Sequence, residues 1–159
     1  MITLAVNRRA RFDFDILETF EAGLSLHGYE VKSVKMGRAS IGGAHAIIRG
    51  EEAYIIGMQI PPYQPDNTPD TYDPSRTKKL ILKKAEIRSL IGKIIQKGLT
   101  LTPIRVYTKR GLVKMELGLA RGKKKEDKRQ KIKERDAKRK IERTLKTRMQ
   151  ITGGRRDST

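Results

Sequence analysis

The sequence of 159 residues contains no cysteine and no tryptophan, and only three of its residues are phenylalanine. Without cysteine the chain can form neither disulfides nor thiolate metal sites, and it has no thiol nucleophile. No apolar run approaches the roughly 20 residues that span a bilayer. The opening MITLAV is too short for a signal peptide and lacks the charged flank of one. We therefore expect a cytoplasmic protein that makes no membrane contact.

Residue types that usually carry catalysis are sparse as well. His27 and His45 are the two histidines, and both lie on expected strand faces with no nucleophile motif nearby. The sequence shows no glycine-rich phosphate loop and no ligand series with metal-binding spacing. We therefore expect neither an enzyme nor a metal site, and no cofactor.

Positive charge, by contrast, is abundant. The 36 lysines and arginines outnumber the 18 aspartates and glutamates, which gives a net charge of +18. Residues 1–120 hold 19 bases and 12 acids, and residues 121–159 hold 17 bases and 6 acids. Because both parts are basic, the expected partner of the whole chain is a polyanion, most commonly a nucleic acid. A basic surface that binds nothing is the alternative.

Residues 20–27 alternate between apolar and polar side chains, a period of two that predicts a half-buried strand. Phe20 and Ala22 face the expected core, and Glu21 faces outward. Two further regions predict hairpins that turn at residues 50–52 and 109–111.

The hairpin arms carry alternating apolar residues too. In the arm after the first turn, the expected inward face consists of Tyr54, Ile56, Met58 and Ile60. In the last arm of the second hairpin it consists of Val113, Met115, Leu117 and Leu119. In the other arm of that hairpin the alternation slips at Pro103, which indicates a β-bulge or an edge position.

Residues 83–98 change to a helical period. The apolar residues recur at i, i+3, i+4, i+7 and i+8, namely Ile87, Leu90, Ile91, Ile94 and Ile95. Gly98 suits the C-terminal cap. Residues 61–76, which contain five of the six prolines, are expected to form a loop. Short antiparallel strands with a helix among them favour a mainly β fold, a small OB-fold-like barrel over residues 1–120 with flanking helices. An open α+β sheet is the alternative.

Residues 121–159 form a basic C-terminal tail. Residues 126–150 contain neither proline nor glycine and consist mostly of good helix formers. Four acid–base pairs at i, i+4 add roughly 1–2 kcal/mol of helical bias. These pairs are Asp127–Lys131, Glu134–Lys138, Asp136–Lys140 and Glu142–Lys146. The apolar stripe of the tail is narrow, so we expect it to be disordered alone and helical against a phosphate surface.

Three blocks of sequence resemble the SsrA-binding protein (small protein B) family. Residues 7–41 read NRRARFDFDILETFEAGLSLHGYEVKSVKMGRASI, and residues 73–93 read DPSRTKKLILKKAEIRSLIGK. Residues 118–129 read GLARGKKKEDKR and are followed by IKERDAKRKIER. The resemblance covers roughly residues 7–148, nearly the whole chain.

The resemblance implies a barrel that binds the tRNA-like domain of transfer-messenger RNA and brings it to stalled ribosomes for trans-translation. It also implies that the tail becomes helical in the decoding region and the empty mRNA channel of the small ribosomal subunit, against rRNA. One monomer is expected per RNA. The alternative is a structural ribosomal protein whose basic extension threads through rRNA.

The resemblance also indicates candidate residues. In the barrel, the RNA-binding positions are Asn7, Arg8, Arg9, Glu21 and Leu82. In the tail, the positions that act on the ribosome are Arg121, Lys123, Lys124, Lys125, Asp127, Lys128, Arg129 and Ile141. Taken without the family, Glu21 would be a solvated strand residue and Leu82 a core residue. Glu126 departs from the family pattern, because many relatives carry a histidine or an aromatic residue there that could stack on a ribosomal base.

Overall fold

The computed structural model describes residues 1–153, apart from the side chains of Lys125, Asp127 and residues 150–153. The chain divides into two compact units, Met1–Gly122 and the segment that begins at Lys123. Among the described residues, every helix is too short or too polar to span a bilayer.

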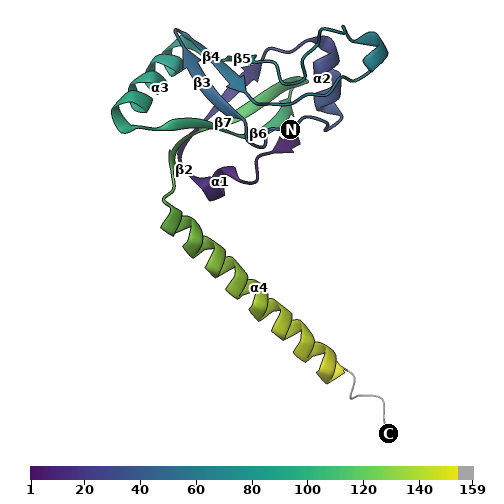
Figure 1. The fold of residues 1–159 in the computed structure, drawn as a ribbon, viewed down its shortest axis with the longest axis vertical. Coiled ribbons are helices and arrows are strands. Elements are labelled where there is room, and N and C mark those ends of the chain that lie inside the picture. Colours follow the sequence, from purple (N-terminus) through teal and green to yellow (C-terminus); the bar gives the residue numbers. More distant parts are fainter. Residues whose placement is uncertain (154–159) are drawn as a thin grey trace. The chain divides into compact units, whose positions relative to one another are not determined.

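Seven antiparallel strands form the first unit, and their sheet closes into a ring (Figure 1). The strands are β1 (Ile2–Val6), β2 (Phe14–Leu24), β3 (His45–Arg49), β4 (Glu52–Ile56), β5 (Lys78–Ile81), β6 (Thr100–Lys109) and β7 (Leu112–Gly122). Their order is β1-β6-β3-β4-β5-β2-β7, and β7 also pairs with β6. This closed antiparallel sheet confirms the predicted small barrel, although β7 extends two residues past the expected boundary at residue 120.

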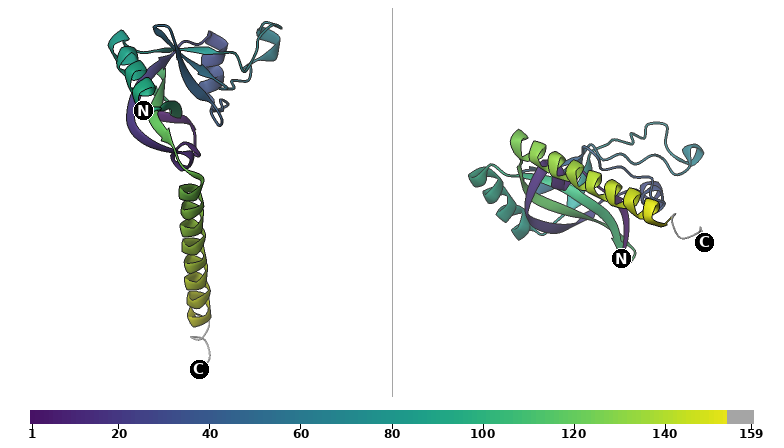
Figure 2. Two further views of the ribbon diagram at one scale, coloured as in Figure 1. Left: turned by 60° about the vertical axis from the view of Figure 1, so that its left-hand side comes forward. Right: turned by 90° about the horizontal axis from the view of Figure 1, so that it is seen from below.

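Short helices flank the barrel. They are α1 (Ala10–Asp13), α2 (Gly28–Lys35), the 3₁₀ turn η1 (Pro65–Asn67) and α3 (Lys84–Lys97). α2 and α3 lie at opposite ends of the barrel (Figures 1 and 2). The helix of the second unit is α4 (Lys125–Gly153).

The β6–β7 hairpin follows its sequence pattern closely. Val113, Met115, Leu117 and Leu119 are all buried, as predicted. The turn places Arg110 and Gly111 at φ values of 52° and 77°, so the glycine sits where the backbone requires a left-handed residue. The predicted slip is confirmed as a register shift between Pro103 and Arg105.

The predicted inward face of the arm after the first turn is wrong for its first half. Ala53 and Ile55 are fully buried, whereas Tyr54 and Ile56 are only half-buried. Gly57 has a φ of 83°, and this left-handed residue shifts the alternation by one position. After it, Met58 and Ile60 are buried as predicted.

The expected strand at residues 20–27 is also too long. β2 ends at Leu24, and His27 is the N-cap of α2 rather than a strand residue. The backbone N–H of His27 donates to Glu30 Oε1 at 2.9 Å, and the backbone N–H of Glu30 donates to the His27 carbonyl oxygen at 3.0 Å, so Glu30 caps the first turn of its own helix.

α3 matches the predicted helix, and Gly98 ends it in the left-handed conformation at φ 60°. Ile87 and Leu90 are buried against the barrel. Ile95, however, is 76% exposed. Eight residues after Ile87 a helix has turned about 80° away from the starting direction, which places Ile95 outside the packed stripe.

The tail sequence forms the helix α4 in the structure. All side chains from Arg129 to Met149 are exposed. Three of the four predicted pairs have described side chains, and none of these three comes within 4.0 Å. Gln130 instead donates to Glu134 at 3.2 Å. The pairs thus contribute little, and the disorder of the free tail stays a prediction.

Candidate nucleic-acid interface

Glu21 lies on the outer face of β2, as predicted, directly opposite Glu116 of β7. Its carboxylate accepts a hydrogen bond from the hydroxyl of Tyr107. Lys109 Nζ lies 3.4 Å from Oε2, and Lys114 Nζ lies 3.8 Å from Oε1. One carboxylate therefore holds two lysines and a tyrosine together on the outer face of three neighbouring strands.

These contacts change the pKa values of the cluster. The Tyr107 hydroxyl holds the pKa of Glu21 below its ordinary value of 4.5, and Lys109 and Lys114 lower it further. Burial raises the pKa of Tyr107 above its ordinary value, and the bond to Glu21 raises it further. At neutral pH the group consists of one carboxylate, one phenol and two ammonium groups, so it carries a net positive charge.

Glu21 and Leu82 line the same depression, with a volume of about 590 Å³. Its other lining residues are Thr19, Phe20, Gly23, Ile81, Lys83, Glu86 and Lys114. The pairing of Gly23 with Ile81 between β2 and β5 brings these distant parts of the sequence together. Leu82 is half-buried and packs against the edge of the core, which gives it a structural role. The rest of its apolar side chain is accessible on the surface.

Asn7 lies at a different place, after β1 and beside the bulge of β6. Its backbone N–H donates to Ile104 O at 2.8 Å, and its side-chain Nδ2 donates to Pro103 O at 3.0 Å. A bulge leaves ladder groups without their strand partner. Asn7 satisfies two of these carbonyls, which is a structural role that the sequence did not indicate.

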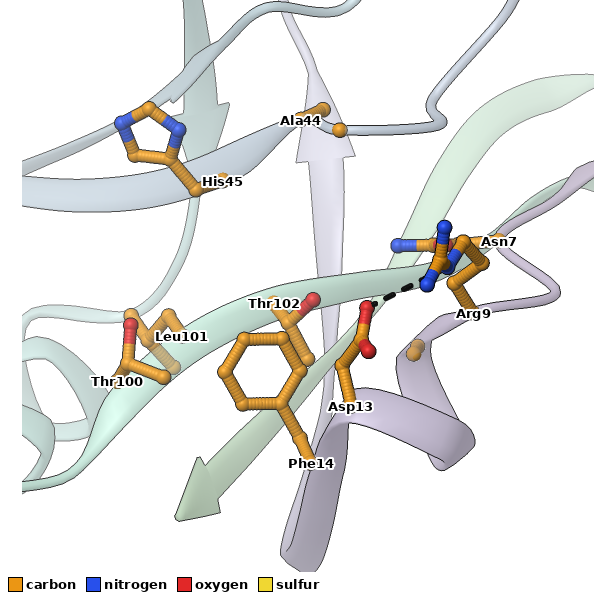
Figure 3. A pocket seen from close by; sticks show the side chains of 11 residues that line it. Asn7, Arg9, Asp13, Phe14, Ala44, His45, Thr100, Leu101 and Thr102 are labelled. Atoms are coloured by element: carbon orange, nitrogen blue, oxygen red, sulfur yellow. Dashed lines mark ion pairs between the residues drawn. The ribbon is translucent and has the colours of Figure 1, made fainter. Parts of the chain in front are cut away.

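Asn7 and Arg9 line a cavity of about 560 Å³ (Figure 3). Figure 3 also shows Phe14, His45 and the ion pair of Arg9 with Asp13, whose Nε and Oδ2 atoms are 3.7 Å apart. The Arg9 side chain is 78% exposed. An exposed arginine whose guanidinium lies 5.9 Å from the centre of the Phe12 ring suits contact with a phosphate. The structure therefore places Asn7 and Arg9 in one depression, and Glu21 and Leu82 in another.

The remaining expected residues follow the chain. Arg8 is exposed but lines neither depression. Arg121 pairs with Asp15 in the β2–β7 ladder. Lys124 O accepts from Lys128 N at 3.2 Å in the first turn of α4. Exposed positions of the tail are Lys124, Glu126, Arg129 and Ile141, and Lys123 and Lys128 are half-buried. The side chains of Lys125 and Asp127 lie outside the described residues.

The sequence did not single out the partners of Glu21, although it contained a signal for two of them. The turn at residues 109–111 fixes the hairpin register, in which Tyr107 lies opposite Lys114. Lys114 lies on β7, which pairs with β2, and Tyr107 lies on the next strand, so both were available to an outward-facing carboxylate on β2. Predicting Lys109 as a further partner would have required knowledge of the strand twist.

A second polar cluster, which the sequence analysis did not predict, surrounds the buried Glu30 of α2. Glu30 is 0% exposed, and Arg76 Nε donates to its Oε2 at 3.1 Å. The Tyr72 hydroxyl lies 3.2 Å from the same oxygen. Burial raises the pKa of Glu30, but the bonds from Arg76 and from the His27 backbone outweigh it and hold the pKa below 4.5.

Lys78 is the second charged residue that is fully buried. Its Nζ donates to the carbonyls of Met58 at 2.8 Å, Arg76 at 2.9 Å and Pro74 at 3.2 Å. Burial lowers its pKa. Pro74 and Arg76 belong to the proline-rich loop, and Met58 follows β4. Lys78 therefore holds that loop against the barrel. In residues 1–153, no group of three or more histidines, aspartates and glutamates is placed to hold a metal ion.

Comparison with known proteins gives consistent matches. A family model described as SmpB protein matches residues 4–147. The SsrA-binding protein of Thermosynechococcus vestitus is 50% identical over 145 residues, which cover 91% of this chain and 95% of that protein. The SsrA-binding protein of Chlorobaculum tepidum is 51% identical over 146 residues, which cover 91% of this chain and 92% of that protein.

A solved structure is similar as well. It is described as "tmRNA-SmpB: a journey to the center of the bacterial ribosome", and one of its chains is 45% identical to this one. The superposition has a TM-score of 0.62 and covers 80% of this chain and 92% of that chain.

Proposed function

The chain belongs to the SmpB family of SsrA-binding proteins, and from this premise we propose that it binds the tRNA-like domain of transfer-messenger RNA and delivers it to stalled ribosomes. The observation that carries the proposal is that the family match over residues 4–147 includes both the barrel and most of the tail. The similar chain of known structure belongs to a transfer-messenger RNA complex, which supports the same function. The protein then works where the ribosomes are, in the bacterial cytoplasm.

In this proposal the barrel captures the RNA through its two depressions. Lys114 and Lys83 neutralise phosphates beside Glu21, and the carboxylate positions the lysines and can accept from a ribose hydroxyl. Leu82 packs against the apolar part of a sugar or base. At the other depression, Arg9 meets phosphate and Asn7 presents its amide, with Arg8 adding charge nearby.

The tail acts on the ribosome. Its 29-residue helix is about 44 Å long, enough to follow a channel lined with rRNA. The basic positions Arg121, Lys123, Lys124, Lys125, Lys128 and Arg129 meet the decoding region, where Asp127 is the one acidic member of the proposed set. Glu126 cannot stack on a base, so either a neighbouring residue supplies this contact or the decoding contact is weaker and more electrostatic.

No catalytic step belongs to this function, because the protein contributes binding surfaces and charge. The alternative of a structural ribosomal protein makes a different prediction about bound RNA. A tagged copy would be immunoprecipitated from growing cells, and the bound RNA would be sequenced. We expect transfer-messenger RNA to be enriched far above rRNA. If the tagged protein instead co-purifies stoichiometrically with ribosomal proteins and rRNA, and transfer-messenger RNA is not enriched, the ribosomal alternative would be supported.

A further inference from the structure

A cleft that the contacts proposed above do not use lies between α2 and residues 61–68. Its volume is about 250 Å³. It is lined by Gly28, Tyr29, Lys32, Tyr63, Gln64, Asn67 and Thr68. This volume is below the roughly 300–1,000 Å³ of pockets that hold drug-sized ligands, so the cleft suits a single ring system. We call it the α2–Tyr63 cleft.

Tyr63 in this cleft lies beside two cations. Lys32 Nζ is 5.8 Å and Arg38 Cζ is 5.9 Å from the centre of its ring. Arg38 Nη1 also donates to the carbonyl oxygen of Tyr63 at 3.4 Å. An aromatic ring flanked by an arginine and a lysine is a combination that proteins use to stack a base and neutralise its phosphate.

The opposite wall is aromatic as well and is held in place. Tyr29 stacks on His27 with ring centroids 5.4 Å apart and meets Tyr72 edge-on at 5.0 Å. The Tyr72 hydroxyl lies 2.7 Å from Ile60 O and 3.2 Å from the buried Glu30 carboxylate. These contacts fix the wall of the cleft that α2 provides.

The Tyr63 wall is fastened too. Ser33 Oγ of α2 donates to Pro61 O at 2.6 Å, two residues before Tyr63. Thr68 Oγ1 donates to Gln64 O at 2.7 Å and closes the turn around η1. With both walls fixed, a ligand in the cleft would need little ordering of the protein, which favours affinity.

The two sides of the α2–Tyr63 cleft carry charges of opposite sign. Lys32, Lys35 and Arg38 are exposed along α2 and just after it. On the other side, Asp66 of η1 and Asp70 are exposed. A phosphate would therefore lie on the α2 side, with its base directed toward the tyrosine.

We propose that the α2–Tyr63 cleft binds one unpaired RNA nucleotide, with the base on the Tyr63 ring and the phosphate on Lys32, Lys35 and Arg38. The nucleotide is unpaired because a ring recessed in a cleft cannot reach a base that is stacked within a duplex. The inference rests on the proposed function, since it adds a contact to a barrel that already binds RNA. Transfer-messenger RNA and rRNA could each supply the nucleotide, and two arms of one experiment separate these sources.

The experiment compares the full-length parent, Tyr63→Ala, Tyr63→Phe and Tyr54→Ala. One arm titrates each protein against the isolated tRNA-like domain, and the other against purified small ribosomal subunits. Losing a base–tyrosine stack weakens binding by about 5- to 150-fold. We expect a loss of at least fivefold for Tyr63→Ala in one arm, and that arm identifies the RNA. Tyr63→Phe keeps the ring and Tyr54→Ala alters β4, so each should lose less than about twofold.

A second variant tests the phosphate side. Lys32→Gln combined with Arg38→Gln retains the ring and should weaken binding in the same arm as Tyr63→Ala. Thermal unfolding followed by circular dichroism checks the fold, and this double variant decides the matter if Tyr63→Ala does not fold. Equal affinities of Tyr63→Ala and Tyr63→Phe in both arms, or an unaffected double variant, would overturn the inference. A parent protein that bound neither RNA would instead refute the proposed function.

Discussion

At the scale of single residues, Glu21 places a carboxylate within the basic surface that we propose binds RNA. It accepts from Tyr107 and lies within 4 Å of Lys109 and Lys114, so it fixes side chains that would otherwise spread over many rotamers. Coulomb attraction to RNA would improve without Glu21, whereas the positions of the lysines would be lost. Because the loss of repulsion and the loss of lysine positioning change RNA affinity in opposite directions, a substitution of Glu21 shows which effect is larger.

Glu21→Ala should therefore weaken binding to the tRNA-like domain by about tenfold, even though it removes a negative charge. A tenfold change corresponds to about 1.4 kcal/mol, near the lower limit for hydrogen bonds to charged groups. Fluorescence titration at constant salt measures it. Glu18→Ala is the matched control, because Glu18 lies on the same strand and pairs with Lys93 at 2.8 Å. Tighter binding by Glu21→Ala would show that the carboxylate only repels RNA.

The ion pair between the buried Glu30 and Arg76 should contribute to the free energy of unfolding. Glu30→Gln leaves the Arg76 guanidinium without its counter-ion, and removing one partner of a buried pair typically costs 3–5 kcal/mol. Arg76 is 28% exposed, so we expect about 3 kcal/mol, the lower end of this range. Urea denaturation at pH 7 measures the loss. The exposed Glu52, which pairs with Lys79 at 2.9 Å, supplies the control Glu52→Gln, and its loss should be clearly smaller.

The pH dependence of the same variant has a defined sign. The pKa of Glu30 is lower in the folded protein than its ordinary value of 4.5. Its contribution is therefore complete above about pH 4.5 and is lost as the pH falls through the folded pKa. The free energy of unfolding of the parent should decline below pH 4.5, and that of Glu30→Gln should decline less steeply. Parallel curves would mean that other carboxylates dominate acid unfolding.

At the scale of elements, length and periodicity decided what the sequence could predict. α3, β6 and β7 have 14, 10 and 11 residues, and their patterns predicted them well. The prediction missed β1, β5 and α2, which have 5, 4 and 8 residues. Such short segments carry too few apolar repeats, and tertiary contacts determine them. β5 even begins with the buried Lys78, which no hydrophobic alternation would place inside.

The residues of the candidate interface were named from the family resemblance, and their geometry could not be predicted from the sequence. Alternation placed Glu21 outward, which is confirmed. Its proximity to Leu82 depends on the pairing of β2 with β5, and the sequence contains no local signal for that pairing. The family resemblance indicated Glu21 and Leu82, but it did not indicate that both residues line one depression. The role of Asn7 at the β6 bulge likewise required the β1–β6 pairing.

The tail helix carries a prediction of its own. Ile141 lies near the middle of α4 and is 62% exposed, so its side chain contributes little packing. Ile141→Pro removes a backbone donor and breaks the helix at a cost of about 3 kcal/mol, with the charge unchanged. We expect it to abolish peptide tagging on stalled ribosomes while binding of the tRNA-like domain stays near the parent value.

Ile141→Ala is the control for the lost side chain, since alanine retains high helix propensity and the same charge. It should tag almost as well as the parent in a reconstituted translation assay. If the proline variant tags equally well, only the charge of the tail matters, and the helix has no role there.

At the scale of the whole molecule, we propose that the two units divide RNA capture and action on the ribosome between them. Residues 1–120 carry a net charge of +7 and hold both depressions, whereas residues 121–159 carry +11. Charge alone would assign RNA capture to the tail, because its charge density is higher. The shaped, hydrogen-bonded surfaces instead lie in the barrel, and we propose that capture depends on them.

A chain that ends at Gly122 tests this claim most directly, because it keeps β7 complete and removes the unit that begins at Lys123. Its affinity for the isolated tRNA-like domain would be measured by titration beside the full-length protein in the same buffer. We expect a dissociation constant within about tenfold of the full-length value, because the barrel keeps both depressions. A loss of more than about a hundredfold, roughly 2.7 kcal/mol, would contradict this expectation and assign RNA capture to the tail.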